Sequence, residues 1–217
     1  DDNTSNLDRW AGNSCLKVGQ LLSSLDRFPV KDFGGVGDNA TDDTAELQAA
    51  INARVALSAT TGGELQLPAG TYRISAALSI PTGVGWKIKG AGRGITIIRQ
   101  VTDNTPIFSI TGANSWGWCI EDLSLDWLNA QPAANTSAIG IYFDGTTGQQ
   151  VFHWQMHRVT FDKGYLAWAS NAAKSNSIWG FHIDDCVVNS SMSGGAIRFV
   201  PSPSVGQPSM SIGTLYM

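Results

Sequence analysis

The hexapeptide Ile120–Leu125 (IEDLSL) has the pattern apolar-x-x-apolar-x-apolar. The pattern returns three times, with successive starts 36, 27 and 29 residues apart, at Met156–Phe161, Ile183–Val188 and Ile212–Met217. Further strand-like runs lie between the copies, at 138–143, 164–168 and 195–199. Each period therefore holds three short strands with turns between them. Because one such coil cannot bury its apolar face alone, the repeat predicts a parallel β-helix whose coils stack.

Stacking of the coils predicts columns of equivalent side chains that point inward. The second apolar position of the repeat gives one column: Leu123, Val159, Cys186 and Leu215. The third apolar position gives another: Leu125, Phe161, Val188 and Met217. Alternation in the preceding strand places Trp118, Trp154 and Phe181 inside as an aromatic ladder. We therefore interpret Trp118 and Trp154 as core residues and not as platforms for sugar rings.

Two segments precede the coils, which occupy residues 63–217. Residues 1–29 combine a polar lead with an apolar stripe from Leu16 to Leu25, and we expect a neck or linker with a short helix. Residues 30–62 contain a turn followed by a helix. Asp43 is the expected N-cap of this helix, and Glu46 completes a capping-box pattern.

The segment Val30–Ile51 (VKDFGGVGDNATDDTAELQAAI) resembles the opening motif of the pectate-lyase-like superfamily, in the variant found in phage tailspikes, capsule depolymerases and endo-polygalacturonases. Gly63–Tyr72 resembles the first coil of these proteins, and Gly90–Gly94 the glycine turn of the next. The resemblance covers roughly residues 30–100. It implies an all-β, right-handed parallel β-helix with three short strands per coil, capped at its N-terminal end by a helix. Asn39 stands where the family commonly has glycine, but asparagine tolerates a left-handed backbone.

The resemblance also implies a function. It implies a phage tailspike that binds and depolymerises bacterial surface polysaccharide, such as capsule, exopolysaccharide or O-antigen. The protein would be a homotrimer in the virion tail, attached to the phage tail or baseplate through its N-terminal region. It would be made in the host cytoplasm and act outside the cell. Two alternatives share the fold: a non-catalytic tail adhesin or structural tail fragment, and a secreted pectinase-type lyase or hydrolase.

The sequence stops inside a repeat, at Met217. We therefore expect the chain to be the N-terminal part of a longer or truncated protein. Proteins of this type carry their catalytic groups in the central coils, so we expect the active site to be incomplete in this chain.

Composition excludes several other functions. The formal net charge is −4, so the chain has no electrostatic reason to bind nucleic acid or an anionic membrane. No apolar run approaches the roughly 20 residues of a membrane span. The three cysteines, Cys15, Cys119 and Cys186, have neither metal-ligand spacing nor the pattern of a disulfide framework. We expect no metal and no cofactor.

The candidate catalytic residues are Asp126 and Asp162, which follow the last apolar residue of their repeats. We expect them to stack one coil apart, about 5 Å between backbones. Adjacent carboxylates raise the pKa of one of the pair, as acid and base roles in glycosidic cleavage require. The alternative is a ladder of polar turn residues that Asn189 continues.

Four residues are candidates for substrate binding. Trp127 opens the longest insertion, 127–137, and could stack on a sugar ring. Tyr142 and Arg198 align on a second face, where Arg198 suits an acidic sugar. His182 lies with Gln155 on a third face. The alternative for each polar side chain is that it is simply solvated.

Overall fold

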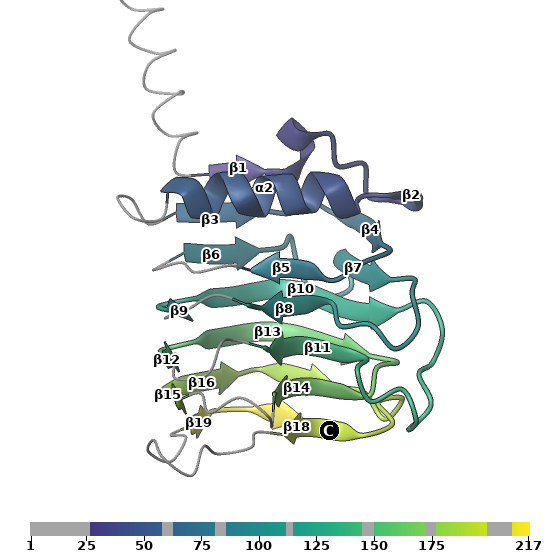
Figure 1. Ribbon diagram of the computed structural model, residues 1–217, viewed down its shortest axis with the longest axis vertical. Coiled ribbons are helices and arrows are strands. Elements are labelled where there is room, and N and C mark those ends of the chain that lie inside the picture. The colour runs from purple at the N-terminus through teal and green to yellow at the C-terminus, as the bar shows by residue number, and fades with distance from the viewer. Residues whose placement is uncertain are drawn as a thin grey trace, which may run out of the picture.

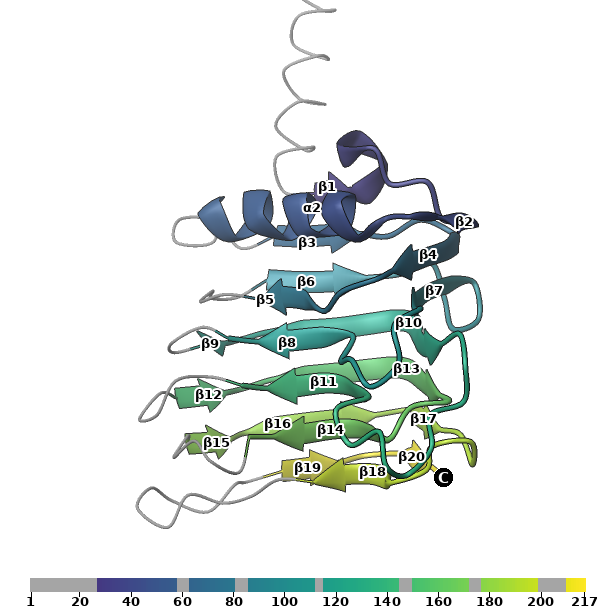
Figure 2. The ribbon, with the colours of Figure 1, turned by 45° about the vertical axis from the view of Figure 1, so that its right-hand side comes forward.

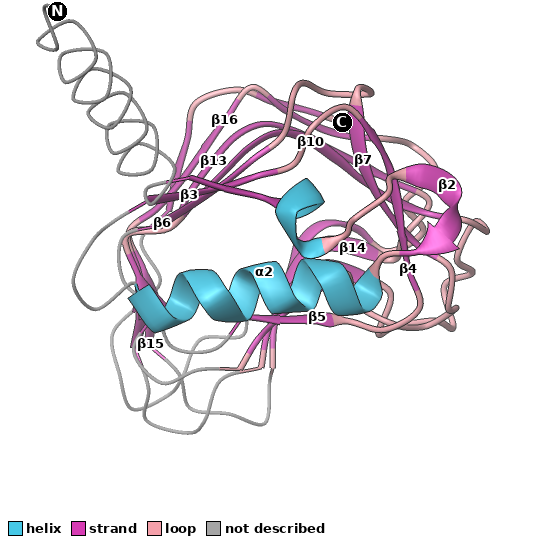
Figure 3. Ribbon diagram, turned by 90° about the horizontal axis from the view of Figure 1, so that it is seen from above, coloured by secondary structure: helices cyan, strands magenta, loops and turns pink. Residues whose placement is uncertain are grey.

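The computed structural model describes residues 27–57, 63–80, 86–111, 115–144, 150–171, 177–198 and 210–217. The described residues form a β-helix in which every paired strand runs parallel to its neighbour (Figure 1). Seen from the N-terminal end, the chain runs clockwise from β13 through β14 and β15 to β16 as it recedes, so the β-helix is right-handed (Figure 3). The predicted fold is confirmed.

The described strands of the coils form three sheets. The largest sheet contains a first row of strands: β1 (Arg27–Pro29), β3 (Gly63–Gln66), β6 (Trp86–Lys89), β10 (Cys119–Trp127), β13 (Gln155–Asp162), β16 (Phe181–Asp184) and β19 (Met210–Ile212). The same sheet continues past a corner with β2 (Asp38–Asp42), β4 (Gly70–Ile74), β7 (Thr96–Gln100), β17 (Cys186–Val188) and β20 (Leu215–Tyr216). The long strands β10 and β13 pass through this corner and pair on both sides of it.

The second sheet has five strands, one from each of five stacked coils: β5 (Leu78–Ile80), β8 (Phe108–Ile110), β11 (Ile139–Phe143), β14 (Leu166–Ser170) and β18 (Gly195–Arg198). The third sheet is short: β9 (Ser115–Trp116), β12 (Gln150–Phe152) and β15 (Ser177–Trp179). Figure 2 shows the coils below one another along the long axis. Residues 1–26, and with them most of the predicted neck, lie outside the described residues, whereas β1 already pairs with β3 of the first coil.

The corner of the large sheet explains the two residues between the first and second apolar positions of the repeat. Asp122, Arg158 and Asp185 occupy the second of these positions, with left-handed φ values of 59°, 53° and 48°. A left-handed residue turns the strand, so the apolar residues on both sides of it point inward. Strict alternation would have sent one of them to solvent.

The N-terminal end is covered by the 3-10 helix η1 (Val30–Phe33) and the helix α2 (Thr44–Leu57) (Figure 1). Asp43 precedes α2, but its buried carboxylate accepts hydrogen bonds from the backbone N–H groups of Val36, at 2.6 Å, and Gly37, at 3.0 Å. It therefore joins the turn to the start of the helix. Asn39 has a φ of 62°, so the predicted left-handed conformation is confirmed. In the described part of the chain no helix is long and apolar enough to cross a bilayer.

The predicted inward columns form the core. The side chains of Leu123, Val159 and Cys186 are buried, as are those of Leu125, Phe161 and Val188, while Leu215 is partly buried. Met217 is the exception: it lies beyond the end of β20 and is 88% exposed. Its assignment to the second column is wrong.

The aromatic ladder is confirmed. The rings of Trp118 and Trp154 stack with centroids 4.8 Å apart and an interplanar angle of 2°. Phe143 packs edge-on against Trp154 and against Phe181. Both tryptophans are at most 1% exposed, so neither can contact a sugar ring.

We predict that Trp154→Ala lowers the free energy of unfolding by about 3–5 kcal/mol, because the substitution removes a ring stacked in the core and leaves a cavity. Urea denaturation followed by circular dichroism measures this change. Leu128→Ala is the control: Leu128 is 46% exposed, and its loss should change stability by no more than about 0.5 kcal/mol. Equal effects of the two substitutions would contradict the ladder's role.

Candidate functional site

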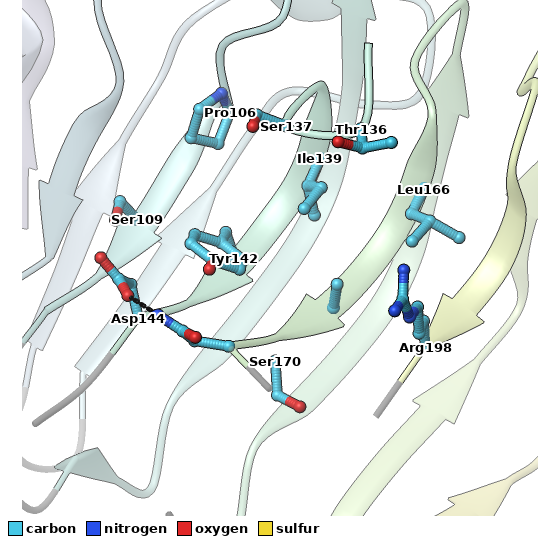
Figure 4. Close-up of a pocket in the computed structure, with 12 residues that line it drawn as sticks. Pro106, Ser109, Thr136, Ser137, Ile139, Tyr142, Asp144, Leu166, Ser170 and Arg198 are labelled. Atoms are coloured by element: carbon cyan, nitrogen blue, oxygen red, sulfur yellow. Dashed lines mark hydrogen bonds between the residues drawn. The ribbon is translucent and has the colours of Figure 1, made fainter. Parts of the chain in front are cut away.

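The outer face of the five-stranded sheet carries a groove of about 500 Å³ (Figure 4). Strands β8, β11, β14 and β18 form its base, and Thr136 and Ser137 of the 127–137 insertion form part of its wall. The insertion is held in place by Gln131, whose buried amide donates to Asp103 and accepts from the backbone N–H of Asn104. The insertion thus helps to shape the groove.

The base of the groove is apolar although it faces outward. Ile139, Leu166 and Ala169 form a small cluster of buried apolar side chains, separate from the main core. Tyr142 packs against this cluster. An outward apolar surface with an aromatic side chain at its edge is suited to the C–H faces of sugar rings.

The polar groups of the groove follow the register of the sheet. Tyr142 pairs with Ala169 on the next coil, and Ala169 pairs with Arg198 on the coil after that. Because Ala169 is small, it leaves room between the tyrosine ring and the guanidinium group. The predicted alignment of Tyr142 and Arg198 on one face is therefore present, and both line the same groove.

Tyr142 stays protonated in this environment. Burial raises the pKa of its phenol, and the negative charge of Asp144 raises that pKa further. The phenol therefore offers a hydrogen-bond donor to a ligand and is a poor proton acceptor. Asp144 accepts a hydrogen bond from Asn171 Nδ2 (Figure 4).

Sequence reasoning missed Asp144, Ser170 and Asn171. Asp144 follows the end of β11, Ser170 is the last residue of β14, and Asn171 follows it. Aligning the strand-like runs 138–143 and 164–168 would have placed these polar residues side by side. The apolar base had no sequence signal, since apolar residues in these runs are equally compatible with the inner core.

Asp126 and Asp162 are paired across β10 and β13, so the predicted stacking is correct. Their surroundings differ from those of an acid–base pair. Asp126 is only 5% exposed and is bound by Arg99, with 2.6 Å between Nη2 and Oδ2, and by Lys163, with 3.2 Å between Nζ and Oδ1. Asp162 accepts a hydrogen bond from Ser191. Neither aspartate lines the groove, and this geometry favours the polar ladder over the catalytic pair.

Trp127 is not a sugar platform. It is 0% exposed, and its Nε1 donates to the carbonyl oxygen of Thr105 at 3.1 Å. Strand β10 extends through Trp127, so alternation from Leu125 turns this ring inward. A Cβ on Gly164 would lie 2.5 Å from the ring, so the next coil closes over it.

The outer face of β6, β10, β13 and β16 carries His182, the remaining candidate for substrate binding, and many charged side chains. His182 lies here beside its register partner Gln155. Glu121 forms ion pairs with Lys87 and Lys89, with 3.1 Å and 3.0 Å between the lysine Nζ atoms and Glu121 Oε1. Next to them Asp122 is bound by Arg158, with 2.6 Å between Nε and Oδ1 and 3.0 Å between Nη2 and Oδ2.

Residues 28–160 match the family described as rhamnogalacturonase A/epimerase, pectate lyase-like. The chain belongs to this family. The pectate-lyase-like resemblance of the opening motif is thereby confirmed.

Two relatives from Azotobacter vinelandii are similar to this pectate-lyase-like chain. Mannuronan C5-epimerase AlgE3 is 43% identical over 111 residues, which cover 46% of this chain and 6% of that protein. The A-module of mannuronan C-5 epimerase AlgE4 superposes with a TM-score of 0.57 at 24% identity, over 86% of this chain and 53% of that module. The chain thus spans about half the length of that module.

A third similarity is to ORF18 of Geobacillus virus E2. The two structures superpose with a TM-score of 0.50 at 18% identity, over 79% of this chain and 43% of the viral one. At this identity the likeness shows the shared fold.

We predict that Asp126→Asn lowers the free energy of unfolding by about 2 kcal/mol, because it leaves Arg99 and Lys163 without their shared counter-charge. The matched control is Asp162→Asn, one coil away, which should cost less than about 1 kcal/mol. Chemical denaturation measures both. A smaller effect at Asp126 than at Asp162 would contradict the ion-pair assignment.

The bridge between Asp122 and Arg158 makes stability depend on pH. The hydrogen bond from Arg158 holds the pKa of Asp122 below its ordinary value of 3.8, and burial only partly opposes this. A lowered folded-state pKa contributes stability that is fully present above the unfolded value and is lost as the pH falls through the folded one. We predict that the stability gap between wild type and Asp122→Asn is constant near neutrality and shrinks below about pH 4. Thermal unfolding across this range, with exposed Asp32→Asn as control, measures the gap; a gap that widens in acid would contradict the assignment.

Proposed function

We propose that this protein binds an acidic polysaccharide in the groove over β8, β11, β14 and β18 and modifies it. The observation that carries this proposal is the apolar base of Ile139, Leu166 and Ala169 beside Tyr142 and Arg198. The base and the tyrosine ring suit sugar rings, and the guanidinium group suits a uronate carboxylate. Membership of the pectate-lyase-like family and the similarity to mannuronan epimerases support this proposal.

The groove fits proton chemistry at a uronate better than hydrolysis. Hydrolysis commonly uses two carboxylates across the scissile bond, whereas Asp144 is the one carboxylate among the described lining residues. Elimination and epimerisation at a uronate need a base for a carbon-bound proton and a cation that stabilises the resulting charge. Arg198 is suited to the cationic role, Asp144 to the base and protonated Tyr142 to the donor.

We infer that the biological setting is a phage tailspike acting on a bacterial surface polysaccharide. The likeness of Val30–Ile51 to the opening motif of tailspikes supports this setting. A homotrimer, joined to the phage tail or baseplate through residues 1–29, belongs to the same proposal. Sedimentation of the intact protein tests it: a trimer supports the tailspike, and a monomer favours the secreted pectinase-type enzyme.

Binding and chemistry are separated by incubating the protein with a polyuronate, such as alginate, and with a neutral polysaccharide. Binding with new ultraviolet absorbance from an unsaturated uronate indicates a lyase. Binding with altered uronate composition but no such absorbance indicates an epimerase. Binding without either change indicates the adhesin. No binding of any acidic polymer would overturn the proposal.

We predict that Arg198→Ala weakens polyuronate binding at least tenfold, about 1.4 kcal/mol, through loss of the paired charge. Arg198→Lys should recover part of the affinity. Arg73→Ala, which makes the same charge change on another face, should leave binding intact.

If activity is found, Asp144→Asn should abolish it and Asp162→Asn should not; the reverse result would instead support Asp126 and Asp162 as the catalytic pair.

A further inference from the structure

Three side chains of the kinds that bind metal ions meet on the outer face of β13 and β16. His182 and Asp184 are two residues apart on β16, so both project from the same face. The parallel register places His157 of β13 directly beside Asp184. One ligand atom from each residue lies within 4.8 Å of the others, and His157 Nδ1 is 4.0 Å from Asp184 Oδ2.

The neighbouring coil leaves space for this cluster. Gly213 follows β19 and lies next in the column after Asp184, since Ile183 pairs with Ile212. A Cβ built on Gly213 would lie 2.6 Å from Asp184 Oδ1. The absence of a side chain at this position therefore keeps the carboxylate in its place beside the imidazoles.

The surrounding charges are already paired with one another. Glu121, above His157 in the same column, is held by two lysines, and Arg158 is held by Asp122. Asp185, next to Asp184, is held by Arg93 at 3.2 Å. Among the described residues, the ion-pair partner of Asp184 is His157. The carboxylate thus faces imidazole nitrogens and not a fixed cation.

We propose that His157, His182 and Asp184 form a binding site for a divalent transition metal ion of the Zn²⁺ class. Two imidazoles and one carboxylate are a ligand set that zinc uses, whereas Ca²⁺ and Mg²⁺ require mainly oxygen ligands. Zinc bonds of about 2.0–2.2 Å place the ligand atoms of a tetrahedral site roughly 3.3 Å apart. The three side chains are partly exposed, and binding of the ion requires them to rotate until the present spacing closes to that value.

The ion would tie two successive coils together and keep one coordination position open to solvent. The site lies on a different sheet from the polysaccharide groove, so it stands independently of the proposed function. The sequence pattern does not predict this site, because His157 and His182 come from separate periods and are 25 residues apart.

The test is calorimetric titration of the full, chelator-stripped chain with Zn²⁺ alone. We expect one ion per chain, a rise in the thermal unfolding midpoint on adding zinc, and a tetrahedral Co²⁺ absorption spectrum when Co²⁺ replaces it. His157→Ala and His182→Ala should each weaken binding at least tenfold and remove the thermal shift. Gly213→Ala should also weaken binding, because its Cβ displaces the Asp184 carboxylate.

The control is His153→Asn, which alters the one histidine of the chain that is not part of the proposed site. His153 has a φ of 54°, which asparagine tolerates, so the fold should be kept and zinc binding should be unchanged. Circular dichroism confirms folding of each variant. The proposal is overturned if the wild type binds no zinc, if the His157 and His182 variants bind as wild type does, or if His153→Asn loses binding equally.

Discussion

Each coil of this protein can bury its inward side chains only against the coils above and below it. Parallel hydrogen bonding holds the coils in register, for example from Leu123 to Val159 and from Leu125 to Phe161. The same register that stacks Trp118 on Trp154 inside the helix also arranges every outward side chain in a column. All the surfaces of functional interest are consequences of this stacking.

The outward columns have different characters on different sheets. Beyond the corner of the large sheet, Arg99, Asp126 and Asp162 succeed one another, and the middle residue, Asp126, is neutralised by Arg99 and by Lys163. On the five-stranded sheet, Tyr142, Ala169 and Arg198 succeed one another, and the small central residue opens a groove. Stacking at strand spacing thus produces a cluster of ion pairs around Asp126 in one case and a ligand-sized surface in the other.

This difference bears on where the chemistry takes place. A pair of carboxylates one coil apart has the spacing for acid–base work, but Asp126 is already compensated by Arg99 and Lys163. Asp144 lines the groove and accepts a hydrogen bond from Asn171 there. The phenol of Tyr142, kept protonated by burial and by Asp144, completes a surface that can donate as well as accept.

Local sequence determined the coil, the inward columns and the capping helix, because alternation, turn residues and the repeat are properties of short segments. The left-handed corner at Asp122, Arg158 and Asp185 is implicit in the spacing of the repeat. Only the tertiary structure decided which outward side chains meet. Trp127 is buried because its strand runs two residues past Leu125, the last apolar residue of the repeat pattern, and Asp126 gains partners from the coils before and after its own. The physical reason is that turns of variable length set the register between coils, and that register selects the neighbours of every outward residue.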